Sequence, residues 1–234
     1  MQFDLANPDR RVNVGIILTG GITEILDVAP IDLVHGLSPS VVKGLPVLSS
    51  FEHQAIDIAV YWVTENGRPA KLTSGITMQA TVSGVQVSEA NVTDQTQHSF
   101  ANCPPLDVVL MGAHMPDYQA NDAELAFIRK SYDQCSAFLA ICMGMENLLR
   151  AGLLEGKTAT APRFLLEHLR KDASGTKWVE KRWAHDGKVW TSGTLLCGLD
   201  MMRAFILETW HDSRPELVEA TLDLSCCPVR EAEY

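Results

Sequence analysis

One stretch of the chain decides its fold: FLAICMGMENLL, which runs from Phe138 to Leu149. Its first four residues form a continuous apolar run, which is typical of a short buried strand. The residues after Gly144 have the spacing of a helix that continues to Ala151. The predicted strand therefore passes directly into a helix, and Cys142 lies at the junction. Gly144 removes a side chain where the backbone doubles back, as in a nucleophile elbow.

The thiol of Cys142 is expected at the carboxyl edge of the sheet, where α/β folds bind their ligands. The positive end of the following helix would favour the thiolate, which is the nucleophilic form of cysteine. Backbone N–H groups after the cysteine would stabilise an oxyanion. The pattern therefore predicts a catalytic cysteine, and a buried structural cysteine at a strand end is the alternative.

The rest of the chain alternates strand-like runs with helical runs. Strands are predicted at Val12–Leu18, Ile56–Val63, Leu106–Met111, Trp178–Trp183 and Lys188–Thr191. Helices are predicted at Ile25–Leu37 and Asp122–Gln134, and a final long helix at Leu195–Trp210. The least periodic stretch, Ser83–Asn102, is expected to hold one strand and a loop. Such alternation indicates an α/β fold with a mostly parallel central sheet covered on both faces. No internal repeat or linker is visible, so residues 1–234 are expected to form one domain.

The composition excludes several classes of protein. The chain has 234 residues, of which 46% are hydrophobic, and a net charge of −10, which argues against binding to nucleic acid or to an anionic membrane surface. We find no signal peptide and no apolar run long enough for a transmembrane helix. The six cysteines include no CxxC pair, and no histidine stands at metal-ligand spacing. These features predict a cytoplasmic protein with reduced thiols and no metal or organic cofactor.

The region around Cys142 resembles a known family. The segment from Ala140 to Thr160 is similar to the nucleophile motif of the ThiJ/PfpI superfamily, the cysteine branch of the class I glutamine-amidotransferase-like fold. Three further blocks resemble the family in the same order, namely ILDVAPID at 25–32, LDVVLMGA at 106–113 and DGKVWTSG at 186–193. The resemblance covers about residues 12 to 210. It implies a flavodoxin-like three-layer sandwich and a homodimer.

The same resemblance implies the other members of the site. An acidic residue should follow the first strand and move a proton to or from the thiol, and both Asp27 and Glu24 fit this role. Asp27 is preferred because it matches the acidic dipeptide of the family. The loop of Gly112 and Ala113 should form an oxyanion hole, with the N–H groups of Ala113 and Met143 as donors. His114 follows this loop and is a further candidate for the substrate pocket.

Three positions carry other residues than the family usually has, and these differences bear on which reactions we expect. Pro162 stands where many members have a histidine close to the cysteine. No Cys–His pair can be read near Cys142, which argues against proteolysis by that route. Met143 replaces the threonine that follows the nucleophile in isocyanide hydratases, and Ala113 replaces the second glycine of the oxyanion loop. The replacement by Ala113 keeps the backbone N–H of the oxyanion loop.

The sequence therefore predicts a cysteine-dependent enzyme with isocyanide-hydratase-like hydration or lyase chemistry on a small electrophilic substrate. Glutathione-independent glyoxalase activity is an alternative, although it normally needs the histidine that Pro162 replaces. A biosynthetic enzyme with an apolar pocket is another alternative. The non-enzymatic alternative is a thiol redox sensor or a chaperone.

Overall fold

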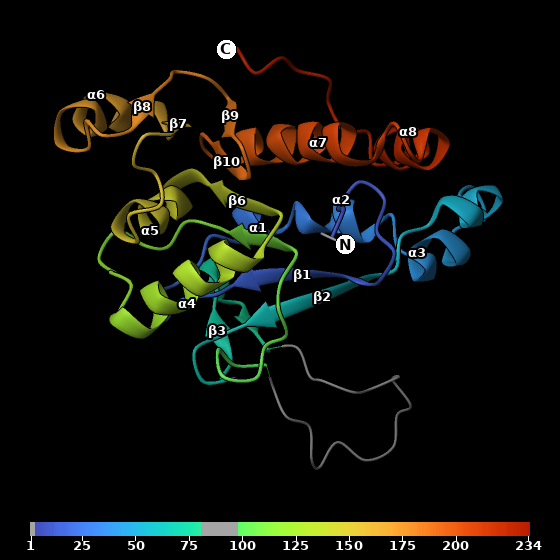
Figure 1. Cartoon of the computed structure of the whole chain (residues 1–234), viewed down its shortest axis with the longest axis horizontal. Helices are drawn as coiled ribbons and strands as arrows, with labels where there is room; N and C mark the ends of the chain where they lie inside the picture. Colours follow the sequence, from blue (N-terminus) through green and yellow to red (C-terminus); the bar gives the residue numbers. More distant parts are fainter. Residues whose placement is uncertain (1–2, 81–97) are drawn as a thin grey trace.

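A computed structural model describes residues 3–80 and 98–234, and most of the strand and loop predicted at Ser83–Asn102 lie outside the described residues (Figure 1). The central sheet has the order β2-β1-β5-β6-β10-β9. Its strands are β2 (Ile58–Val63), β1 (Val12–Ile17), β5 (Val108–Met111), β6 (Ala137–Ile141), β10 (Val189–Ser192) and β9 (Trp183–Asp186). All neighbours pair in parallel except β9 and β10, which are antiparallel. The predicted mostly parallel, flavodoxin-like sheet is confirmed.

Two apolar cores lie on opposite faces of this sheet. Side chains alternate between the faces along each strand, so Val108 and Leu110 of β5 join one core while Val109 and Met111 join the other. The first core packs under α1 (Ile25–Val28), α2 (Ile31–His35), α7 (Leu196–Trp210) and α8 (Pro215–Leu224). The second packs under α4 (Asp122–Gln134), α5 (Met145–Arg150) and α6 (Arg163–Asp172). The fold therefore has three layers, as the sequence predicts.

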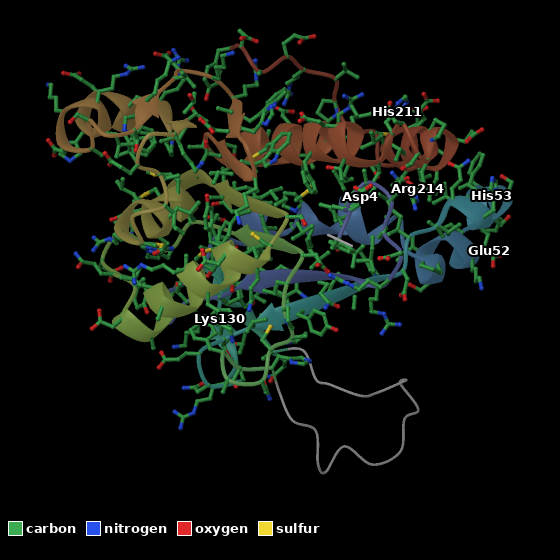
Figure 2. All side chains as sticks on the ribbon, viewed as in Figure 1. Asp4, Glu52, His53, Lys130, His211 and Arg214 are labelled. Carbon is green, nitrogen blue, oxygen red and sulfur yellow. The ribbon has the colours of Figure 1, made fainter. Side chains whose placement is uncertain are left out.

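Shorter elements surround the central sheet. They are α3 (Pro39–Gly44), the 3-10 helices η1 (Ser49–Gln54) and η2 (Thr73–Gly75), and the two small sheets β3 (Ala70–Lys71) with β4 (Thr77–Met78) and β7 (Thr158–Ala159) with β8 (Lys177–Trp178). Charged side chains such as Glu52, His53 and Lys130 are exposed on the outer surfaces (Figure 2). Within the described part of the chain, no helix is both long and apolar enough to span a bilayer.

The helix α4 shows how local sequence sets an element boundary. The side chain of Asn121 accepts a hydrogen bond from the Glu124 N–H at 3.0 Å, and the Glu124 carboxylate accepts one from the Asn121 N–H at 2.8 Å. This capping box satisfies two free donors at the start of the helix. Glu124 also accepts a bond from the Gly20 N–H at 2.7 Å, which ties the loop after β1 to α4.

Three sequence predictions are wrong in detail. The helix predicted at Ile25–Leu37 is two short helices, because Pro30 has no N–H and cannot continue the first one. The strand predicted at Trp178–Trp183 ends after Trp178. The carbonyls of Val179 and Lys181 accept hydrogen bonds from the Thr160 hydroxyl, at 2.8 and 3.0 Å, and so do not pair with a neighbouring strand there. The helix ending at Trp210 is not the last, because α8 follows it.

The parallel strands place the candidate site. β5, β6 and β10 end at the same edge of the sheet, so Gly112, Cys142 and Gly193 follow three adjacent strands. Gly144 allows the start of α5 to approach this edge, because a Cβ on it would lie 2.6 Å from the carbonyl oxygen of Met111. Neither the Met111 carbonyl nor the backbone of residue 144 can move away without shifting β5 or the start of α5.

Replacing Gly144 with alanine should therefore destabilise the fold. We expect Gly144→Ala to lower the free energy of unfolding by about 1–3 kcal/mol, as overpacking does. Urea unfolding followed by circular dichroism measures this. Gly44→Ala is the matched control, because nothing lies within 4 Å of a Cβ at that position. Equal stability of the two variants would show that the close approach at Gly144 carries no strain.

Candidate active site

Cys142 occupies a sharp turn between β6 and α5. It is the first residue of the 3-10 helix η3 (Cys142–Gly144) and has a left-handed backbone with φ 57°, which non-glycine residues rarely adopt. Its N–H donates to the carbonyl oxygen of Gly193 at 3.1 Å, so the neighbouring strand holds the turn. Strained backbone of this kind persists where the surrounding structure fixes it, and it is common at functional sites. The geometry has the form of the elbow that the sequence predicts.

Asp27 brings a buried carboxylate to the same edge of the sheet. The side chain is fully buried, and its Oδ2 accepts a hydrogen bond from the Ala113 N–H at 2.9 Å. Its Oδ1 has no hydrogen-bond partner among the described residues. Gly112 permits this approach, since a Cβ there would lie 2.8 Å from the Cβ of Asp27. The buried carboxylate thus keeps one oxygen free to accept or hold a proton.

The environment of Asp27 favours its protonated form. Burial raises the pKa of the carboxyl group to about 6, and the charge of Glu24 acts in the same direction, while the Ala113 N–H opposes both. A carboxyl group with a pKa near neutrality can both donate and accept a proton at physiological pH. Asp27 is therefore suited to proton transfer.

Cys142 does not have the lowered pKa that its place before a helix predicts. Burial, and next the negative charge of Asp27, raise the pKa of the thiol to about 12. The backbone N–H groups of Met143 and Leu195 lower it but do not outweigh these effects. The expectation of a resting thiolate is thus wrong, because desolvation of the charge exceeds the stabilisation by these two N–H groups.

The donors around the thiol also differ from the predicted oxyanion hole. The Ala113 N–H is already bound to Asp27, so it is not free for an oxyanion. The N–H groups that act on the thiol are those of Met143 and Leu195. Sequence reasoning missed Leu195. The signal was its position shortly after Ser192, the last residue of β10, which is the parallel neighbour of β6 and ends at the same edge of the sheet.

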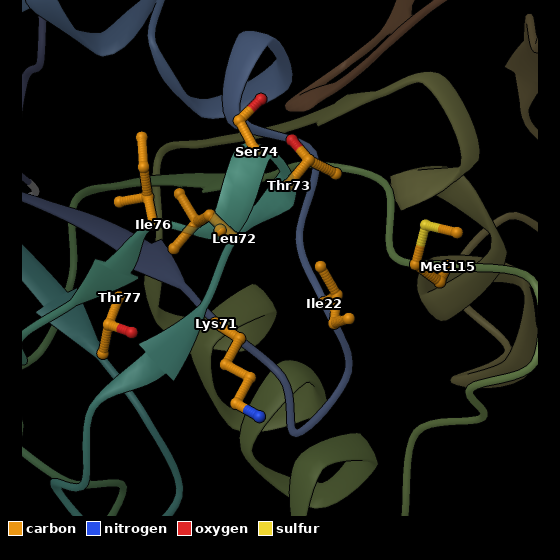
Figure 3. A pocket seen from close by; sticks show the side chains of 9 residues that line it. Ile22, Lys71, Leu72, Thr73, Ser74, Ile76, Thr77 and Met115 are labelled. Carbon is orange, nitrogen blue, oxygen red and sulfur yellow. The ribbon is translucent and has the colours of Figure 1, made fainter.

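Glu24 lies at the start of α1, beside a surface pocket. The Thr73 hydroxyl donates to Glu24 Oε1 at 3.0 Å, and the Glu24 N–H donates to the Ala113 carbonyl at 2.8 Å. Thr73 also lines a pocket of about 460 Å³, whose apolar walls include the exposed side chains of Ile22 and Met115 (Figure 3). Glu24 is half-buried and hydrogen-bonded, whereas Asp27 is buried with a free oxygen. This contrast favours Asp27 as the partner of the thiol.

His114 is the remaining candidate of the sequence analysis. It is buried, with Nδ1 at 3.0 Å from the Met115 carbonyl and its ring edge-on to Tyr118, and its Nε2 has no hydrogen-bond partner among the described residues. Arg163, which follows Pro162, forms an ion pair with Glu180 at 2.8 Å on the surface. In the described ranges 3–80 and 98–234, no group of three or more His, Cys, Asp or Glu side chains is placed to hold a metal ion.

Comparisons with known proteins agree with the fold and with the family that the sequence resembles. A model described as the DJ-1/PfpI family matches residues 47–208. An isonitrile hydratase from Pseudomonas putida is 30% identical over 132 residues, which are 56% of this chain and 57% of that protein. The match therefore spans little more than half of the relative.

Solved structures resemble the chain over nearly its whole length. A THiJ/PfpI family protein from Pseudomonas syringae has a TM-score of 0.69 and 16% identity, and the match covers 95% of this chain and 77% of that one. Drosophila melanogaster DJ-1beta has a TM-score of 0.64 and 15% identity, with 94% and 100% covered. At these identities the likeness shows the fold alone.

Replacing Asp27 should change the pH dependence of stability. The folded pKa of about 6 lies above the ordinary 3.8, so the unfolded state loses its proton first as pH rises. Wild-type stability therefore falls between about pH 4 and pH 6, by about 2–3 kcal/mol in total. Asp27→Asn cannot ionise, so its stability relative to wild type should rise by that amount over this range. Urea unfolding at pH 4 and pH 7 measures the difference. The exposed Asp32→Asn is the control, and an equal change in both variants would contradict the assignment.

The same substitution should activate the thiol. Asp27→Asn removes the negative charge that opposes ionisation of Cys142, so its thiolate population should rise. We expect iodoacetamide at pH 7.5 to modify Cys142 roughly three- to tenfold faster than in wild type. Mass spectrometry of the Cys142 peptide gives the rate, and Asp32→Asn is again the control. An unchanged or slower rate would show that Asp27 does not act on the thiol.

Proposed function

The chain belongs to the DJ-1/PfpI family, and from this premise we propose that it is a cysteine-dependent enzyme that hydrates isonitriles or a chemically similar small electrophile. One observation carries the proposal. Asp27 is buried beside Cys142 with a free carboxylate oxygen and a pKa of about 6. A neutral thiol next to a proton acceptor suits a reaction in which the thiol adds across an electrophilic carbon and its proton is transferred during that addition.

The proposed reaction begins with one proton shared by the thiol and the carboxylate. Cys142 passes its proton to Asp27 as Sγ attacks the terminal carbon of the isonitrile, and a new S–C bond forms. Asp27 then returns the proton to that carbon, which gives a thioimidate bound to the enzyme. Because the charge on sulfur exists only during bond formation, the high resting pKa of Cys142 does not prevent the reaction.

Water completes the cycle. Its oxygen adds to the thioimidate carbon, one of its protons passes to the substrate nitrogen, and Asp27 takes up the other. The C–S bond then breaks, the sulfur regains a proton from Asp27, and an N-substituted formamide leaves. The N–H groups of Met143 and Leu195 stabilise negative charge on sulfur in both half-reactions. Water and isonitrile account for all the atoms of the product.

The other candidates are less well supported by the site. A redox sensor needs an accessible thiolate, whereas burial and Asp27 disfavour ionisation of Cys142. A glyoxalase of the family type would need a histidine where Pro162 precedes α6. A biosynthetic enzyme with an apolar pocket at the thiol finds no support in the pocket of Ile22 and Met115, because neither Cys142 nor Asp27 lines it. The homodimer, the single domain and the cytoplasmic location stay predictions.

Turnover should depend on both members of the pair. We expect Cys142→Ser to lose isonitrile hydration to the background rate and Asp27→Asn to lower kcat by about 10²–10⁴-fold, since it removes the proton acceptor. Both should keep the wild-type circular dichroism spectrum. A panel of isonitriles and α-oxoaldehydes, followed by product analysis, measures the activity.

The matched control is Cys226→Ser, which changes an exposed thiol. Retained turnover in Cys142→Ser would overturn the mechanism. Turnover of α-oxoaldehydes but not of isonitriles would favour the glyoxalase alternative. No turnover of either class by the wild-type protein would overturn the proposed function.

A further inference from the structure

The segment after α8 folds back onto the edge of the sheet that carries the site. The Arg182 N–H donates to the Ala232 carbonyl at 2.6 Å, in front of β9. Arg230 lies 3.4 Å from the buried carboxylate of Asp200 in α7, and Arg182 lies 3.8 Å from the same carboxylate. Figure 1 shows this segment returning from α8 along α7 toward β9. Backbone and side-chain contacts thus hold the segment in place.

Tyr234 is the point where this segment meets the site. Its ring lies 4.7 Å from the guanidinium carbon of Arg163 and 5.1 Å from that of Arg182. Its Oη lies 3.8 Å from the Cys197 Sγ. A Cβ on Gly193 would lie only 2.7 Å from the same Oη, so the phenol is packed directly on this glycine. Burial raises the pKa of Tyr234 to about 12, so the hydroxyl keeps its proton at physiological pH.

Tyr234 contacts the turn after β10, and the same turn is hydrogen-bonded to Cys142. The Gly193 carbonyl accepts the Cys142 N–H at 3.1 Å, and the Gly193 N–H donates to the Arg182 carbonyl at 2.9 Å. Two residues later, Leu195 has φ 41° and ψ −98°, which is a strained backbone for a leucine, and its N–H faces the thiol. Strain of this kind is kept only where neighbouring groups hold it.

We propose that Tyr234 is a positioning residue, which packs on Gly193 and Cys197 and so holds the Gly193–Leu195 turn in the conformation that presents the Leu195 N–H to Cys142 Sγ. The inference deepens the proposed function, because it concerns the thiol that the proposed reaction uses. The charges that act on the thiol come from Asp27 and Glu24 on the α1 side. The charges next to Tyr234 come from Arg163 and Arg182.

The test compares three variants without using turnover. Tyr234→Ala should speed hydrogen exchange in the peptide that covers residues 192–199, because the turn loses its support. It should also slow the reaction of Cys142 with iodoacetamide at pH 8 by roughly three- to tenfold, because one N–H leaves the thiolate. Tyr234→Phe keeps the ring against both guanidinium groups but loses the Oη that lies against Gly193 and Cys197, so it should show most of the effect of Tyr234→Ala. Val229→Ala is the control, since this side chain is 76% exposed.

The outcomes separate this inference from the proposed function. Slower alkylation and faster exchange in both Tyr234 variants, and not in Val229→Ala, support the positioning role, whatever the enzyme turns over. Unchanged exchange in Tyr234→Ala overturns it. Faster alkylation of Cys142 also overturns it, because Tyr234 would then only shield the thiol from solvent. Equal effects of Val229→Ala, or a Tyr234→Phe variant that behaves like wild type, overturn it as well. If the wild-type protein does not hydrate isonitriles, hydrogen exchange and the alkylation of Cys142 still test the role of Tyr234.

Discussion

The left-handed backbone of Cys142 is the constraint on which the site depends. A residue at φ 57° turns the chain sharply, so the thiol stands at the edge of the sheet instead of continuing along β6. Two contacts hold this turn, namely the bond from the Cys142 N–H to Gly193 and the close approach of Gly144 to Met111. Both come from neighbouring parallel strands. The reactive geometry is therefore a property of the sheet edge, and the local sequence alone would not maintain it.

The second organising interaction is electrostatic. Asp27 and Cys142 are both desolvated, and the negative charge of Asp27 disfavours a second negative charge on the thiol. Burial of the two groups therefore opposes a resting state in which both are ionised. In the reaction that we propose, the proton leaves the thiol for the carboxylate, so the site carries one negative charge at a time.

Much of the fold could be predicted from the sequence, and the errors have physical causes. The helix at Asp122–Gln134 is predicted with its observed bounds, because a capping box starts it and its apolar face is regular. The site residues Cys142 and Asp27 were found through their motifs. The state of the thiol was predicted wrongly, because the helix dipole is visible in the sequence whereas desolvation is not. Leu195 and Tyr234 were missed because contacts between segments distant in sequence bring Leu195 to the thiol and Tyr234 to the neighbouring Gly193.

The sequence by itself determined the order of strands and helices, the parallel α/β class and the placement of Cys142 at a strand-to-helix junction. These follow from apolar periodicity and from short motifs, which are local properties of the chain. Only the tertiary structure decided how deeply each carboxylate is buried, which N–H groups act on the thiol and in which direction burial shifts its pKa. Each of these depends on how far water is excluded and on which strands end side by side, and both are set only when the three layers pack together.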